Sequence, residues 1–106
     1  MVTDLKERPS FEAFKGMLMD TVSAITGREC SSYDRWLDLG DEAVRQGILY
    51  TFKKNIESEY GVELVLREGL FNSDIVLESM AIQLHHVFNN VYLMERINYK
   101  IRKRKN

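Results

Sequence analysis

The sequence predicts an all-α fold, a small helical bundle with an extended C-terminal helix. The 106 residues include a single proline and six glycines, so the chain has few of the residues that separate short elements. Its apolar residues also recur every three or four positions over three long stretches, which is the period of an amphipathic helix. We expect residues 1–9 to form a flexible lead-in and residues 10–106 to form a single helical domain.

The first helix is predicted near residues 10–26. Ser10 is a suitable N-cap, because its side chain can accept a hydrogen bond from the first helical turn. Gly27 follows the last apolar position and suits the left-handed conformation in which many helices end. The apolar positions between them are Phe11, Phe14, Met17, Leu18, Val22 and Ile25.

The second helix is predicted near residues 41–60, after a polar connection. Asp41 is the expected N-cap, and Glu42 in the first turn complements the positive end of the helix dipole. Gly61 ends the helix. The predicted buried stripe is Val44, Ile48, Phe52 and Ile56, widened by Leu49 and Tyr60, and the connection before it is anchored by Tyr33, Trp36 and Leu39.

Val62, Leu64 and Leu66 alternate with Glu63 and Val65, a spacing of two that is also the period of a strand. With no partner strand elsewhere in the sequence, we expect an extended loop packed on the bundle. A short turn of helix is predicted near residues 66–71, and Asn72 or Ser73 is expected to cap the last helix.

The last helix is predicted over residues 74–103. At about 1.5 Å per residue it would run roughly 45 Å, longer than a domain of this size is wide. Its apolar residues form two heptad series, widened by Phe88 and Ile97: Leu77, Leu84 and Val91, then Met80, Val87, Met94 and Ile101. The distal members are therefore expected to be covered by a second copy or a dedicated protein partner. These members are Val87, Val91, Met94, Ile97 and Ile101.

The charge is distributed unevenly. Residues 96–106 hold six cations and no acid, whereas residues 1–95 hold nine cations and 16 acids, a formal charge of −7. Arg102, Lys103 and Arg104 belong to this basic C-terminal tail. Such cations complement a helix dipole, and they would also suit an acidic protein, the acidic body of a second copy, or nucleic acid. Because the rest of the chain is acidic, nucleic acid is the least favoured partner.

The order of these elements resembles that of the acyl and peptidyl carrier proteins. The residues that carry the resemblance are Leu39-Gly40 before the second helix, Tyr60-Gly61-Val62-Glu63-Leu64 at its end, and the Leu66–Phe71 segment. It covers roughly residues 11–88. The resemblance implies a helical bundle that docks on partner proteins through an acidic second helix, including Asp41 and Glu42.

The serine that bears phosphopantetheine in carrier proteins is missing. Aligned from Leu39-Gly40 its position is Ala43, and aligned backwards from Gly61 it is Gln46. Ser73 is a remote candidate, although only one helix follows it and a helix N-cap is the simpler interpretation. We therefore expect no phosphopantetheine arm and no other cofactor.

No catalytic or metal-binding motif is found. His85 and His86 are adjacent on a helix, so their side chains point about 100° apart and cannot chelate one ion together. Cys30 has no second cysteine for a disulfide, which favours a reducing, cytoplasmic location. No apolar run approaches 18 residues and no leader is apparent, so neither a membrane span nor a signal peptide is expected.

Two functions are consistent with the sequence. The first is a non-enzymatic protein similar to an acyl carrier protein, which acts by protein–protein docking without the arm. The alternative is an unrelated small helical assembly protein that dimerises through its last helix and contacts an acidic partner or nucleic acid through its basic tail.

Overall fold

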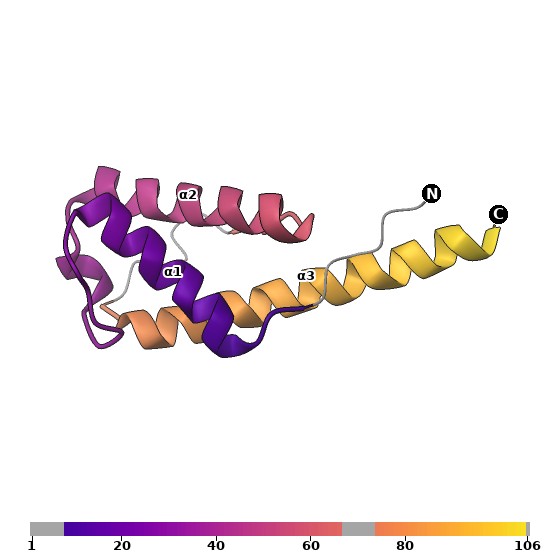
Figure 1. Cartoon of the computed structure of the whole chain (residues 1–106), viewed down its shortest axis with the longest axis horizontal. Helices are drawn as coiled ribbons and strands as arrows, with labels where there is room; N and C mark the ends of the chain where they lie inside the picture. The colour runs from indigo at the N-terminus through magenta and orange to yellow at the C-terminus, as the bar shows by residue number, and fades with distance from the viewer. Residues whose placement is uncertain (1–7, 67–73, 106) are drawn as a thin grey trace.

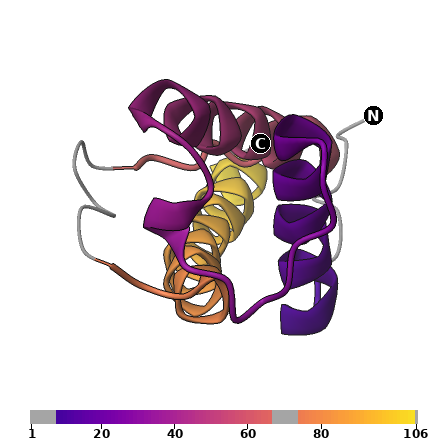
Figure 2. The same ribbon diagram turned by 90° about the vertical axis from the view of Figure 1, so that its left-hand side faces the viewer.

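The predicted all-α bundle is confirmed by a computed structural model, which describes residues 8–66 and 74–105 apart from the side chains of residues 99, 100 and 102–105. Its elements are α1 (Phe11–Thr26), the short 3-10 helix η1 (Trp36–Asp38), α2 (Glu42–Tyr60) and α3 (Leu77–Lys105). Helices α1 and α2 cover one side of α3 (Figures 1 and 2). Within the described ranges there is no strand, only an isolated bridge between Arg35 and Val76.

Local signals set the ends of α1 and α2 where the sequence predicts them. The side chain of Ser10 accepts a hydrogen bond from the backbone N–H three residues later at 3.1 Å, and Asp41 does the same at 3.0 Å. Both helices end at a glycine in the left-handed region, with φ of 73° at Gly27 and 68° at Gly61. These four residues satisfy backbone groups that the helix ends leave unpaired.

Phe14 of α1 lies at the centre of the core, where it joins all three helices. Its ring centroid is 5.2 Å from that of Phe52 in α2 and 5.5 Å from that of Phe88 in α3. The Phe14–Phe52 pair is edge-to-face, an arrangement that the aromatic quadrupole favours. Tyr60 and Tyr92 extend the cluster from Phe88, with centroid distances of 5.5 and 5.8 Å.

The segment after α2 is the extended loop that the sequence predicts. Val62 and Leu64 are fully buried, while Glu63 between them and Val65 after them are exposed. Alternate residues thus close one side of the core without forming a strand. Leu66 is not helical, and the rest of the turn of helix predicted over 66–71 lies outside the described residues.

The predicted start of the last helix is wrong, because α3 begins at Leu77 and not at residue 74. The residues just before it pair with the loop that precedes η1. The N–H of Trp36 donates to the carbonyl of Ile75 at 2.7 Å, and the N–H of Leu77 donates to the carbonyl of Asp34 at 2.9 Å. Loop carbonyls therefore satisfy first-turn amides that a side-chain cap would otherwise satisfy. The expected caps, at residues 72 and 73, lie outside the described residues.

Two of the three predicted anchors of the loop point inward. Trp36 and Leu39 are 2% and 6% exposed, but Tyr33 is 77% exposed. Tyr33 lies in a turn, where its N–H donates to Ser31 Oγ at 3.1 Å and Ser31 N–H donates to Asp34 Oδ2 at 2.9 Å. The turn directs the Tyr33 side chain into solvent, so the expectation for this residue is wrong.

The buried stripe of α3 departs from the heptad pattern. Its buried members are Leu77, Met80, Ala81, Leu84, Phe88 and Tyr92. A straight α-helix has 3.6 residues per turn, so a strict seven-residue repeat drifts around its surface. The buried positions of α3 therefore continue from Phe88 to Tyr92, four residues later. The heptad series that contains Met94 turns away from the bundle.

Two glycines near the start of α2 give a matched test of these contacts. Gly40 has a φ of 156°, and a Cβ there would lie 2.9 Å from Val44 Cβ, whereas a Cβ at Gly47 would meet nothing within 4 Å. We expect Gly40→Ala to lower the free energy of unfolding by about 1–3 kcal/mol through overpacking. Gly47→Ala should raise it by about 0.5–1 kcal/mol, the usual difference between alanine and glycine inside a helix.

Urea unfolding followed by circular dichroism measures both changes. A Gly40→Ala variant as stable as the wild type would contradict the close approach of this loop to α2.

Candidate interaction surface

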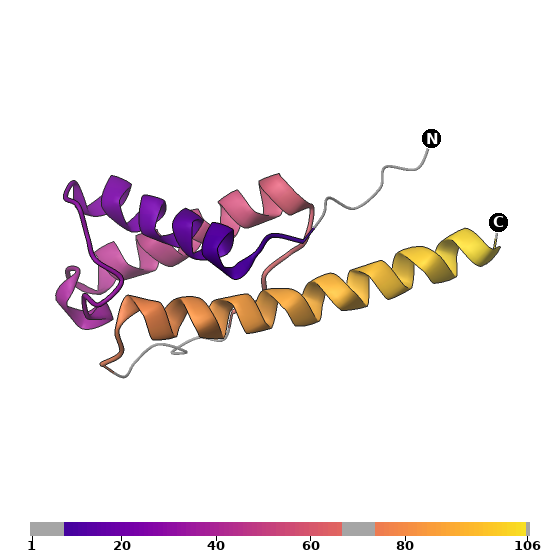
Figure 3. The ribbon, with the colours of Figure 1, turned by 60° about the horizontal axis from the view of Figure 1, so that its bottom comes forward.

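The distal part of α3 projects beyond the bundle. Tyr92 is the last of its core residues, and α3 then continues past the ends of α1 and α2 (Figures 1 and 3). Residues 93–105 span about 20 Å of helix. This projection makes the molecule long and narrow, with principal extents of 51, 23 and 21 Å.

Four large apolar side chains on the projecting part form what we term the distal apolar face. The exposed fractions are 45% for Leu93, 58% for Met94, 51% for Ile97 and 47% for Ile101. Leu93, Ile97 and Ile101 are spaced by four residues and therefore line one side of the helix. Ile97 follows Phe88 by nine residues, or two and a half turns, so this face points away from the core.

The structure separates the predicted distal stripe into two groups. Val87 and Val91 are half-buried and pack against the core of their own bundle, so they offer little open surface. Met94, Ile97 and Ile101 are open to solvent. Leu93 was not among the predicted contact residues, because it belongs to neither heptad series.

The basic tail continues the same helix. The backbone of α3 runs to Lys105. The side chains of the predicted contact residues Arg102, Lys103 and Arg104 lie outside the described part of the structure. Arg96, the first cation of the tail, is exposed.

The start of α2 is the position that the carrier resemblance singles out. Asp41, Glu42, Ala43 and Gln46 are all exposed there. The Asp41 carboxylate accepts the N–H of Val44 and is thus committed to capping α2. Ala43 and Gln46 present no nucleophile to which an arm could be attached.

The far end of α2 carries both signs of charge. Glu57 Oε1 lies 3.8 Å from Lys53 Nζ, and Glu57 Oε2 lies 3.7 Å from Lys54 Nζ. Pairs of this kind, partly open to solvent and at separations of about 4 Å, contribute little to stability. They do reduce the acidic character that a carrier-like docking helix would need.

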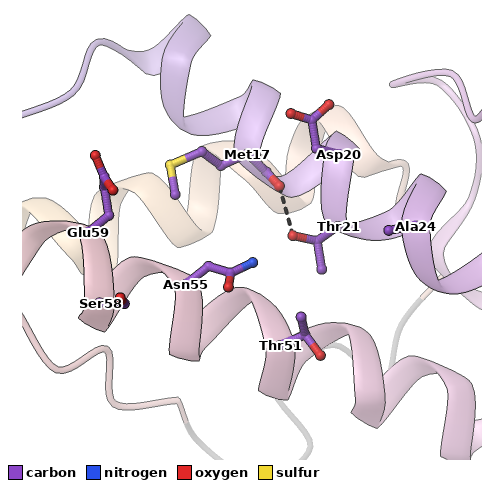
Figure 4. A pocket seen from close by; sticks show the side chains of 8 residues that line it. All are labelled: Met17, Asp20, Thr21, Ala24, Thr51, Asn55, Ser58 and Glu59. Carbon is purple, nitrogen blue, oxygen red and sulfur yellow. Dashed lines mark hydrogen bonds between the residues drawn. The ribbon is translucent and has the colours of Figure 1, made fainter.

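A groove lies between α1 and α2 (Figure 4). It is open to solvent and has a volume of about 410 Å³. The Thr21 hydroxyl donates to the Met17 carbonyl at 2.9 Å, so it is occupied within its own helix. The groove residues include no histidine, cysteine or lysine that could pair with a carboxylate or hydroxyl for catalysis. They are Met17, Asp20, Thr21, Ala24, Thr51, Asn55, Ser58 and Glu59.

The two histidines occupy different surroundings. His86 is exposed, whereas the His85 ring packs 5.5 Å from that of Phe11 and 5.1 Å from that of Phe14. His85 Nε2 and Asn89 Oδ1 are buried and have no hydrogen-bond partner among the described residues. The described ranges contain no group of three or more His, Cys, Asp or Glu residues that could hold a metal ion.

Comparisons with models of protein families, with curated proteins and with solved structures find no match to this chain. In the part of the chain that the structure describes, no helix is long and apolar enough to cross a membrane.

The projecting segment should be less stable than the rest of α3. Isolated helices shorter than about 12–15 residues are marginal in water, and no described side chain beyond Tyr92 belongs to the core. We expect amides of residues 94–105 to exchange hydrogen much faster than those of residues 80–92 in a dilute solution of the chain. Hydrogen exchange with mass-spectrometric detection measures this difference, and uniform protection along α3 at micromolar concentration would contradict it.

Proposed function

We propose that this chain is a non-enzymatic docking protein that binds another protein chain through the distal apolar face. The observation that carries the proposal is the exposure of Leu93, Met94, Ile97 and Ile101 on a helix that extends beyond its own bundle. Soluble proteins seldom leave a contiguous apolar patch of this kind in water unless it binds a partner.

The size of the face favours a reversible contact. Full burial of a large aliphatic side chain contributes about 1.5–3 kcal/mol, so four half-exposed side chains contribute roughly 3–6 kcal/mol from this chain. A matching face on the partner would add a similar amount. Association costs about 4–15 kcal/mol in lost translational and rotational freedom. The difference between the free energy gained by burial and the cost of association is small, so we expect a reversible complex and not a permanent one.

The resemblance to carrier proteins gives a second form of the proposal. It is supported by the small all-α bundle, by the Leu39-Gly40 turn before α2, and by an exposed Ala43 in the first turn of that helix. In this form the chain docks on a carrier-recognising protein without bearing an arm. The mixed charges of α2 favour the distal apolar face as the principal docking surface instead.

Both forms of the proposal exclude a reaction with the enzyme that loads carrier proteins. We expect the full chain to gain no mass when it is incubated with a phosphopantetheinyl transferase and coenzyme A, because Ala43 and Gln46 cannot form the phosphodiester. Intact-mass measurement decides this, with a known carrier protein as the positive control. Attachment of the arm at any serine would overturn the docking proposal in both forms, and Ser73 would be the first residue to examine.

The docking surface itself can be tested by photo-crosslinking in cells that express the full chain. We expect a photo-reactive phenylalanine at Ile97 to give a discrete crosslinked product, because that side chain would lie in the interface. The same group at exposed Gln46, on α2, is the matched control and should give no such product. The change Leu93→Glu should remove the Ile97 product, since burying a carboxylate against an apolar partner is costly.

A product at Gln46 instead of Ile97 would favour docking through α2. Absence of a product at both positions would contradict the docking function.

A further inference from the structure

The geometry points to a second copy of this chain as the occupant of the distal apolar face, and we propose that the two α3 helices pair antiparallel with their two-fold axis near Ile97. This inference rests on the proposed function, because it identifies the partner that the same face binds. It follows from the spacing of the apolar residues and from the placement of the charges.

The distal apolar face matches itself when one copy is reversed. Leu93 precedes Ile97 by four residues, and Ile101 follows it by four. A two-fold axis at Ile97 therefore sets the two Ile97 side chains together and places Leu93 of each copy opposite Ile101 of the other. Such an interface uses the same patch on both copies and closes as a dimer.

Charge determines the direction of pairing. A parallel pair would place two basic tails, with six cations each, side by side. Packed helices lie about 8–10 Å apart, within about one Debye length at physiological salt, so these charges would repel one another. An antiparallel pair sends the two tails to opposite ends of the dimer.

The reversed helix also leaves the packing of the other bundle intact. With the axis at Ile97, residues 102–105 of one copy lie level with residues 89–92 of the other. Helices α1 and α2 contact the core side of α3, as the ring contacts of Phe11 with His85 and of Tyr60 with Phe88 show (Figure 3). Because the distal apolar face points away from the core, the reversed helix lies on the side of α3 opposite α1 and α2 and does not compete with them.

The predicted interface is small. Two helical segments of about four turns each bury an area near the lower limit of roughly 1,200 Å² that stable complexes show. We therefore expect a dissociation constant on the order of 10 μM, which sedimentation equilibrium over a range of protein concentrations measures. The change Ile97→Glu, at the axis, should weaken self-association at least about tenfold, because it places a carboxylate in the apolar contact twice.

Disulfide trapping tests the direction of pairing in a Cys30→Ser background. Positions 90 and 104 are equally far from Ile97, so they meet across an antiparallel dimer. Full-length Asn90→Cys and Arg104→Cys variants would be mixed at about 100 μM, well above the expected dissociation constant, and oxidised. Intact mass separates the three disulfide-linked products. We expect the mixed 90–104 product to dominate. The control variant Glu95→Cys, whose cysteine lies on the opposite side of α3 from Ile97, should form little disulfide-linked dimer.

Each outcome decides the proposal. Dominant 90–90 and 104–104 products would indicate parallel pairing and overturn it. A chain that sediments as a monomer at 100 μM, while its Ile97 photo-product contains a different protein, would overturn the second copy as occupant and leave the docking function standing. A chain that is monomeric and gives no Ile97 photo-product would contradict both the second copy as occupant and the docking function.

Discussion

The position of Phe14 constrains the whole bundle. Helix α1 lies against both α2 and α3, and the Phe14 ring contacts Phe52 on one and Phe88 on the other. In the first turn of α3, Glu78 Oε2 accepts a hydrogen bond from Lys15 Nζ at 3.1 Å, and this bond raises the pKa of Lys15 above its ordinary value. Because α1 is short, the packing that it organises ends near Tyr92, and the remainder of α3 is left to project.

The predictions that succeeded depend on neighbours in the sequence. A cap such as Ser10 or Asp41 acts on a backbone N–H three residues away, so α1 and α2 can be placed from local pattern alone. The start of α3 depends instead on a loop some 40 residues earlier, which no local signal reveals. Tyr33 illustrates the same limit, because the turn that exposes it is held by side-chain bonds of Ser31 and Asp34.

The candidate site was predicted only in part, for a geometric reason. The sequence shows that the apolar residues of α3 outnumber those that a small bundle can cover, and Met94, Ile97 and Ile101 are indeed exposed. It does not show where the core stripe ends, because that depends on how far α1 and α2 reach along α3. The heptad pattern therefore assigned Val91 to the open surface. It omitted Leu93, which follows Phe88 by five residues and so lies about 140° around the helix from the core.

The hydrogen bonds between the loop at 32–36 and the residues at 75–78 have a kinetic consequence. A simple helical bundle is rich in local contacts and folds fast, whereas contacts between distant parts of the chain require loop closure first. The bond from Trp36 to Ile75 encloses all of α2 within one such closed loop. The first-turn amides of Leu77 and Glu78 therefore gain their loop acceptors only when this loop has closed.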